Sequence, residues 1–253
     1  MNDACSRFRF SANTGFLWKE RPFLERIELA ACHGFDGVEF HDEAQRENKK
    51  AVKEKLVRSG IPVISINTRM GKTVGCAAIP DMQERARQEI SETIELAETL
   101  EAVSIHVLSG RTNTEAAFDM FAENLLFALD RTNLTVLIEP ISPKAMPDYF
   151  MNNLDLAIEI IAELDHPRLK VLFDCFHISH ETSDLLSKFK SVADHVGHVQ
   201  ISSFPDRQEP EDGTINYSDL LPEMQNCGYS GWFGCEYNPA ATTEAGLSWR
   251  NGF

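Results

Sequence analysis

The feature that most constrains this chain is a repeated alternation of short β-rich runs with longer amphipathic runs. Apolar residues recur at helical spacing in the longer runs, as at 82–100 and 154–164. Eight strands separated by helices are typical of a closed parallel barrel. We therefore expect the α/β class, with a single (β/α)₈ TIM barrel domain over residues 1–253. The eight expected strands span 7–13, 37–40, 62–67, 102–108, 134–139, 169–174, 196–202 and 232–236.

Glycines mark the joints between several helices and the strands that follow them. Gly34, Gly60 and Gly228 each stand between an amphipathic run and a β-rich run. A glycine just past a helix can take the left-handed conformation that ends it. The recurrence of this joint favours a repeating architecture.

The composition indicates in which cellular compartment the protein is expected and which partners are disfavoured. No stretch of about 18 apolar residues is present, and no basic head precedes an apolar run at the N-terminus, so we expect neither a membrane span nor a secretory signal. The six cysteines form no C-x-x-C pair, which favours free thiols and a cytoplasmic location. The formal net charge of −15 disfavours nucleic acid as a partner.

Polar residues end the last four expected strands. Apolar runs lead into Glu139, Asp174, Gln200 and Glu236. In a parallel barrel all carboxyl ends of the strands meet at one face, so these side chains should converge there. Any one of them alone would also suit a strand-end cap or a surface acid. Together, their oxygen ligands favour one hard divalent ion, Mg²⁺ or Mn²⁺.

Further polar residues are expected near the same face as substrate contacts. Arg207 lies in a polar loop after the seventh strand, where its guanidinium could bind a carboxylate with two hydrogen bonds. His198 lies two residues before Gln200, so we expect it deeper in the barrel, behind the ion ligands. The substrate-contact candidates are Asn67, His106, Lys144, His177 and Arg207.

Several motifs together resemble the hydroxypyruvate isomerase family, which belongs to the xylose isomerase-like barrels. They are dense in the second half of the chain and looser in the first. The motifs are GFDGVEF at 34–40, LIEPI at 137–141, MPDYF at 146–150, HVQI at 198–201, GTINY at 213–217, GWFGCEY at 231–237 and TEAGL at 243–247. The sequence departs from the family at 41–43 and 68–72, two expected loops that border the barrel mouth.

The resemblance implies roles for the strand-end residues. Glu139, Asp174, Gln200 and Glu236 would be the metal ligands, and Glu139 and Glu236 would also be the catalytic acid–base pair. His177 and Arg207 would contact substrate.

The implied reaction is isomerisation of a small hydroxy-keto acid, such as hydroxypyruvate to tartronate semialdehyde, or of a 2-oxo-tetronate. The bound ion would hold the carbonyl and the neighbouring hydroxyl, and proton transfer would pass through an enediolate. A sugar epimerase or dehydratase on the same metal site is the nearest alternative. A DNA-repair endonuclease and a non-catalytic binding barrel are the other two. Apolar residues near the end (Leu247, Trp249 and Phe253) suggest either a homo-oligomer contact or a cover for the barrel bottom.

Overall fold

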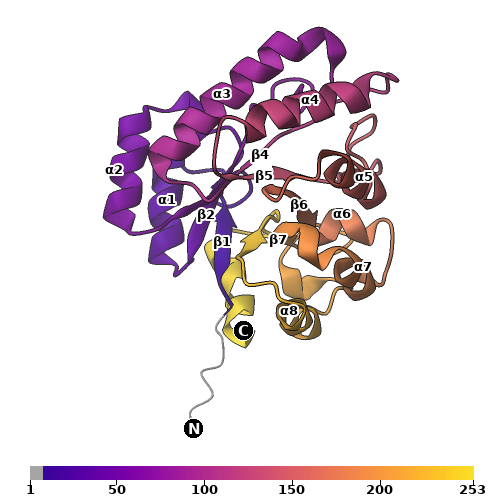
Figure 1. The fold of residues 1–253 in the computed structure, drawn as a ribbon. Helices are drawn as coiled ribbons and strands as arrows, with labels where there is room; N and C mark the ends of the chain where they lie inside the picture. Colours follow the sequence, from indigo (N-terminus) through magenta and orange to yellow (C-terminus); the bar gives the residue numbers. More distant parts are fainter. Residues whose placement is uncertain (1–7) are drawn as a thin grey trace.

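Eight parallel strands form a closed barrel in sequence order in the computed structural model, which describes residues 8–253 (Figure 1). Each strand pairs with the next, and the eighth pairs back with the first, as the sequence predicts. The strands are β1 (Phe10–Asn13), β2 (Gly37–Phe40), β3 (Val63–Asn67), β4 (Ser104–His106), β5 (Thr135–Ile138), β6 (Leu169–Asp174), β7 (Val196–Ile201) and β8 (Phe233–Cys235).

The helices surround this barrel on its outside (Figure 1). The connection from β6 to β7 carries two helices, the short α6 and then α7. After β8 a 3₁₀ helix, Glu244–Gly252, stands in the place of the eighth outer helix. The α-helices are α1 (Phe23–Cys32), α2 (Lys49–Ser59), α3 (Gln83–Leu100), α4 (Ala117–Leu129), α5 (Leu154–Leu164), α6 (Cys175–Ser179), α7 (Leu185–Val192) and α8 (Tyr217–Asn226).

Six of the eight strands are shorter than the sequence predicts, whereas β2 and β6 have the expected bounds. The first expected strand begins at Arg7, which lies outside the described residues, and β1 starts at Phe10. At the other end of the strands, β5 stops at Ile138 and β8 stops at Cys235. Glu139 and Glu236 are therefore the first residues beyond their strands, in the loops of the barrel mouth.

The helix ends are set by local hydrogen bonds and by glycine. Asn48 and Asn153 accept hydrogen bonds from the third backbone amide after them, which caps α2 and α5 at their N-termini. Gly34, Gly60 and Gly228 have φ angles of 72°, 64° and 96°. This confirms the left-handed joints expected at these positions, where most side chains would be strained.

An aromatic cluster closes the bottom of the barrel. Phe10 and Phe233 are register partners at the starts of β1 and β8. The ring of Trp249 meets Phe10 edge-on with centroids 5.2 Å apart, and Phe253 meets Phe10 at 5.9 Å. Leu247 is buried too, and Figure 1 shows the C-terminal segment beside β1. These residues therefore cover the barrel bottom within one chain. Homo-oligomer formation remains a prediction, and these residues no longer support it.

Two expectations from composition concern membrane-spanning helices and cysteines. Within residues 8–253, no helix combines the length and the apolar character that crossing a bilayer requires. The cysteines that the structure describes are free thiols, and Cys5 lies outside the described residues.

Candidate metal and substrate site

The four strand-end residues converge at the mouth of the barrel. Asp174 ends β6 and is the register partner of Gln200 in β7, so their side chains share one side of the sheet. Glu139 and Glu236 follow β5 and β8 directly. All four are buried, with exposures of 1–6%. Three carboxyl groups this far from water need a cation or protons to offset their charge.

His177 lies within the carboxylate cluster. Helix α6 begins immediately after β6, and its first turn brings His177 back over the strand end. The Nε2 atom of His177 lies 3.6 Å from Oε1 of Glu139 and 3.6 Å from Oδ2 of Asp174. Ligand atoms of these three residues all lie within 4.8 Å of one another. The geometry thus groups this expected substrate contact with two of the expected metal ligands.

Arg207 bridges two of the carboxylates. Its Nη2 atom donates to Oδ2 of Asp174 over 3.0 Å and also to Oε2 of Glu236. The guanidinium lies between the rings of Phe16 and Phe176, 4.8 Å from each ring centre. These two cation–π contacts hold the positive charge at the top of the site.

The other oxygen of Glu236 has two partners. The Nδ2 atom of Asn13, the last residue of β1, donates to Oε1 over 3.0 Å. His41, the first residue after β2, places Nε2 3.0 Å from the same oxygen. Both oxygens of Glu236 are therefore held by neighbouring side chains.

Glu139 and Asp174 resist ionisation in the ion-free protein. Burial raises the pKa of Glu139 well above its usual range, and the charges of Glu236 and Asp174 add to the shift. Burial also raises the pKa of Asp174 to about 7, although Arg207 opposes the shift. A divalent cation among these groups would reverse the effect, because opposite charge favours the ionised form.

Glu236 and His177 shift in the opposite direction. Burial works against ionisation of Glu236, but the charge of Arg207 and the hydrogen bond from His41 outweigh it and lower the pKa of Glu236 to about 2. Burial lowers the pKa of His177 to about 3, and that of His106 to about 3 as well. Both imidazoles are therefore neutral at ordinary pH, which is the form that can ligate a metal.

Unpartnered oxygens show that the residues present fit a hard cation. Oε1 of Glu139 and Oε1 of Gln200 are buried without a hydrogen-bond partner. The amide nitrogen of Gln200 donates to Oε2 of Glu39 over 2.8 Å. The side-chain oxygen of Gln200 therefore points away from Glu39. His198 lies one layer deeper, with Nε2 3.0 Å from Glu39, as the sequence predicts. Oxygen atoms with free lone pairs are the ligands that Mg²⁺ and Mn²⁺ prefer. The raised pKa values of Glu139 and Asp174 likewise indicate a site that a cation would stabilise.

A cavity of ≈ 140 Å³ opens above these residues. Asn67 lines it and shares a hydrogen bond with His106, whose Nδ1 lies 3.2 Å from Oδ1 of Asn67. Lys144 is exposed, and only its neighbours Ala145 and Met146 reach the cavity. The lining residues are Phe16, His41, Asn67, Met70, Val74, Leu108, Glu139, Ile141, Ala145, Met146, His177, Arg207 and Glu236.

Segments 41–45 and 67–70, which include the two loops expected to depart from the family, meet beside this cavity. The carboxylate of Asp42 accepts a hydrogen bond from the backbone amide of Met70 over 3.2 Å. Gln45 donates to the backbone oxygen of Asn67 over 2.7 Å. His41 and Met70, one from each loop, both line the cavity. These two segments therefore form part of one wall of the site.

Several residues of the site were not identified from the sequence as site residues. They are Asn13, Phe16, Glu39, His41, Met70 and Phe176. The signal used for the last four strands also applies to the first two, because Asn13 ends β1 and His41 directly follows β2. Phe16, Met70 and Phe176 reach the site from loops or a short helix and carry no such signal.

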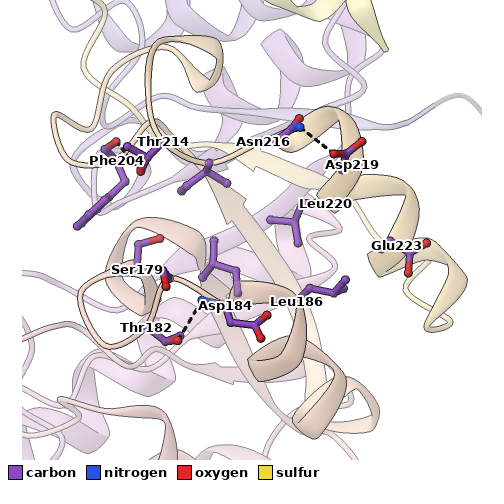
Figure 2. Close-up of a pocket in the computed structure, with 13 residues that line it drawn as sticks. Ser179, Thr182, Asp184, Leu186, Phe204, Thr214, Asn216, Asp219, Leu220 and Glu223 are labelled. Atoms are coloured by element: carbon purple, nitrogen blue, oxygen red, sulfur yellow. Dashed lines mark hydrogen bonds between the residues drawn. The ribbon is translucent and has the colours of Figure 1, made fainter.

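A larger hollow of ≈ 410 Å³ lies elsewhere, between α7 and the segment that leads into α8 (Figure 2). Two of its hydrogen bonds join lining residues to each other: Asp184 to Thr182 over 3.0 Å, and Asn216 to Asp219 over 2.8 Å. None of the strand-end residues lines it. This hollow is thus separate from the cluster of strand-end residues at the barrel mouth.

Comparison with known proteins agrees with this arrangement. The profile of the xylose isomerase-like TIM barrel family matches residues 27–252. The crystal structure of an AP endonuclease, family 2, from Brucella melitensis superposes with a TM-score of 0.93 at 33% identity, covering 97% of this chain and 98% of that one. The chain therefore belongs to the xylose isomerase-like TIM barrel family.

Curated relatives narrow the class. The 2-oxo-tetronate isomerase of Cupriavidus necator is 36% identical, with 95% of this chain and 96% of the relative covered. The hydroxypyruvate isomerase of Escherichia coli is 34% identical, with 95% and 97% covered. The resemblance to the hydroxypyruvate isomerase family is thereby confirmed, and the chain is an enzyme of the isomerase class.

Proposed function

We propose that this chain is a divalent-metal-dependent isomerase of small 2-oxo acids that carry a hydroxyl on the neighbouring carbon. Hydroxypyruvate and a 2-oxo-tetronate both have this arrangement, and both appear in the names of the relatives. The observation that carries the proposal is the placement of two buried glutamates, Glu139 and Glu236, on one cavity of ≈ 140 Å³. A cavity of this size suits a substrate of three or four carbons.

The ion would be held by Glu139, Asp174, Gln200 and Glu236, with His177 as a further donor. When bound, a divalent ion supplies positive charge that favours the negative charge developing on the substrate oxygens. This assignment is supported by the unpartnered oxygens of Glu139 and Gln200 and by the raised pKa values of Glu139 and Asp174.

The reaction exchanges a carbonyl and a hydroxyl between neighbouring carbons without net oxidation. One glutamate removes the proton from the hydroxyl-bearing carbon, and the electron pair forms the double bond of an enediol. A proton is then delivered to the former carbonyl carbon, while the hydroxyl proton moves to the other oxygen. From hydroxypyruvate the product is tartronate semialdehyde. Two carboxyl groups on one cavity supply the acid and the base that these steps need.

Arg207 is the candidate for the substrate carboxylate. Among the described residues that line the cavity, it is the only Arg or Lys. In the protein without substrate, the charge of Arg207 lowers the pKa of Glu236. If the guanidinium transfers its hydrogen bond from Glu236 to the substrate, the pKa of Glu236 rises. Binding of substrate would then make Glu236 a stronger base.

A substrate panel tests this proposal. The purified protein is stripped of metal, reloaded with Mg²⁺ or Mn²⁺, and incubated with hydroxypyruvate, a 2-oxo-tetronate and a ketohexose. Proton NMR of the products should show carbonyl migration in the two acids and none in the ketohexose. Epimerisation of the ketohexose with unchanged keto acids would instead assign an epimerase.

A further inference from the structure

The imidazole of His41 lies against one of the two glutamates of the site. Its Nε2 atom is 3.0 Å from Oε1 of Glu236, and the two side chains are only 16% and 8% exposed. A carboxylate oxygen accepts hydrogen bonds and donates none, so Nε2 carries the proton of this bond. Oε2 of Glu236 is left facing Arg207 and Asp174.

Gly15 provides the space that this ring occupies. A Cβ atom at position 15 would lie 2.2 Å from Nδ1 and 2.5 Å from Cγ of His41, far inside van der Waals contact. The backbone of Gly15 is not in the left-handed region that favours glycine, so other residues can adopt its conformation. The imidazole of His41 is thus the reason that the structure requires glycine here.

Asn13 joins the same unit. Its Oδ1 atom accepts a hydrogen bond from the backbone amide of Gly15 over 2.9 Å, and its Nδ2 atom donates to Glu236 over 3.0 Å. Phe16, which also lines the cavity, meets the imidazole of His41 edge-on, with centroids 5.5 Å apart at 87°. The end of β1 and the first residue after β2 therefore hold one oxygen of Glu236 from two directions.

We infer that Gly15 and His41 form a matched pair that positions Glu236. His41 is a positioning residue that fixes which carboxylate oxygen is turned toward substrate and ion, and Gly15 admits its ring. The inference rests on the proposed function, because Glu236 is taken as a metal ligand and as one of the two proton-transferring groups.

A double-mutant cycle tests the pair. Gly15→Ala, His41→Ala and the double variant are compared with wild type, with His41→Gln as the conservative variant. The matched control is Gly252→Ala, because no atom lies within 4 Å of a Cβ at position 252 and its φ is ordinary. Three quantities are measured: the Kd for Mn²⁺ from the electron paramagnetic resonance of free Mn²⁺, kcat and KM for hydroxypyruvate, and the midpoint of thermal unfolding.

His41→Ala should weaken Mn²⁺ binding or lower kcat by about 10- to 100-fold, as removal of groups that orient metal ligands does. His41→Gln should recover most of the loss, since its Nε2 can donate to the same oxygen. Gly15→Ala, introduced into the wild-type protein, should cause the same loss as His41→Ala, because the new methyl group displaces the imidazole of His41. In the His41→Ala background the same substitution should add nothing, and Gly252→Ala should match wild type.

The inference is overturned if His41→Ala keeps the wild-type Kd and kcat, or if Gly15→Ala has the same effect with and without His41. It is also overturned if His41→Ala only lowers the unfolding midpoint and His41→Gln recovers neither Kd nor kcat. If wild type binds Mn²⁺ but converts no hydroxy-keto acid, the proposed function fails and the Kd cycle still decides the inference. If wild type binds no Mn²⁺, both fall.

Discussion

Inside the barrel, the side-chain amide of Gln200 donates a hydrogen bond to Glu39 over 2.8 Å. Glu39 is 2% exposed, and its other oxygen is bonded by Ser11. Because a carboxylate only accepts, the NH₂ group of Gln200 must face Glu39, and its unpartnered oxygen must face the ion site. Glu39 thus fixes the orientation of an expected metal ligand from the layer below.

Replacement of Glu39 should therefore weaken Mn²⁺ binding although it changes none of the expected ion ligands. In Glu39→Ala the amide of Gln200 is free to rotate, and we expect the Kd for Mn²⁺ to rise about tenfold. Ser11→Ala is the matched control, since it removes a partner of Glu39 but leaves the bond to Gln200. Isothermal calorimetry measures the Kd of both variants. Equal losses in the two would show that the buried network, and not the amide orientation, controls the affinity.

Neutralising either glutamate of the cavity should stop the chemistry and spare the fold. Glu139→Gln and Glu236→Gln are each expected to lower kcat by at least about 100-fold, because each removes a proton-transferring group. Glu139→Gln should not lower the unfolding midpoint of the ion-free protein, since it removes a carboxyl group whose ionisation is opposed by burial and by two neighbouring carboxylates. Near-wild-type turnover in either variant would disprove its assigned role.

Metal stabilisation should depend on pH in a definite direction. The ordinary pKa of Asp174 is 3.8, and burial raises it to about 7 in the ion-free folded protein. Between these values the folded state binds more protons than the unfolded state, so the group makes the ion-free protein less stable as pH rises through this window. A cation needs the ionised carboxylate, and below pH 7 it must displace the proton.

The apparent affinity for Mn²⁺ should therefore fall by at least about tenfold for each pH unit below 7, because Glu139 must lose its proton as well. The measurement is the shift of the unfolding midpoint produced by Mn²⁺ at pH 6 and at pH 8, which should be larger at pH 8. Equal shifts at both values would mean that no proton is displaced from the site.

DNA binding is not expected, although one structural neighbour is named an AP endonuclease. The net charge of −15 opposes approach to a phosphate backbone, and the described cavity contains a single Arg or Lys. Fluorescence anisotropy with an abasic duplex at low salt should show no binding. Binding that weakens steeply with added salt would contradict this expectation.

Much of the fold and half of the site follow from the sequence. The strands of a parallel barrel are buried on both faces, so their apolar runs stand out, and the first polar residue after each run marks the mouth. This rule located Glu139, Asp174, Gln200 and Glu236 at one end of the barrel. The rule does not extend to Lys144, an exposed loop residue, because the position of a loop side chain depends on how the loop folds.

The remaining site residues could not be found because their roles depend on contacts distant in sequence. The glycine at position 15 is explained by the ring of His41, and the role of Glu39 by the hydrogen bond that it accepts from Gln200. Phe16 and Phe176 acquire a role only when Arg207 lies between their rings. Pairings of this kind arise from barrel closure, which local sequence patterns do not encode.

In the proposed reaction, a proton moves between neighbouring carbons of a hydroxy-keto acid, and this transfer depends on a divalent ion and on two glutamates. The most direct measurement is NMR of hydroxypyruvate incubated in D₂O with the Mn²⁺- or Mg²⁺-loaded protein, with chelated protein and Glu139→Gln as controls. We expect tartronate semialdehyde that carries solvent deuterium at the former carbonyl carbon, formed by the loaded wild type alone. Product without deuterium, which would indicate a hydride shift, or equal turnover after chelation would contradict the proposed reaction.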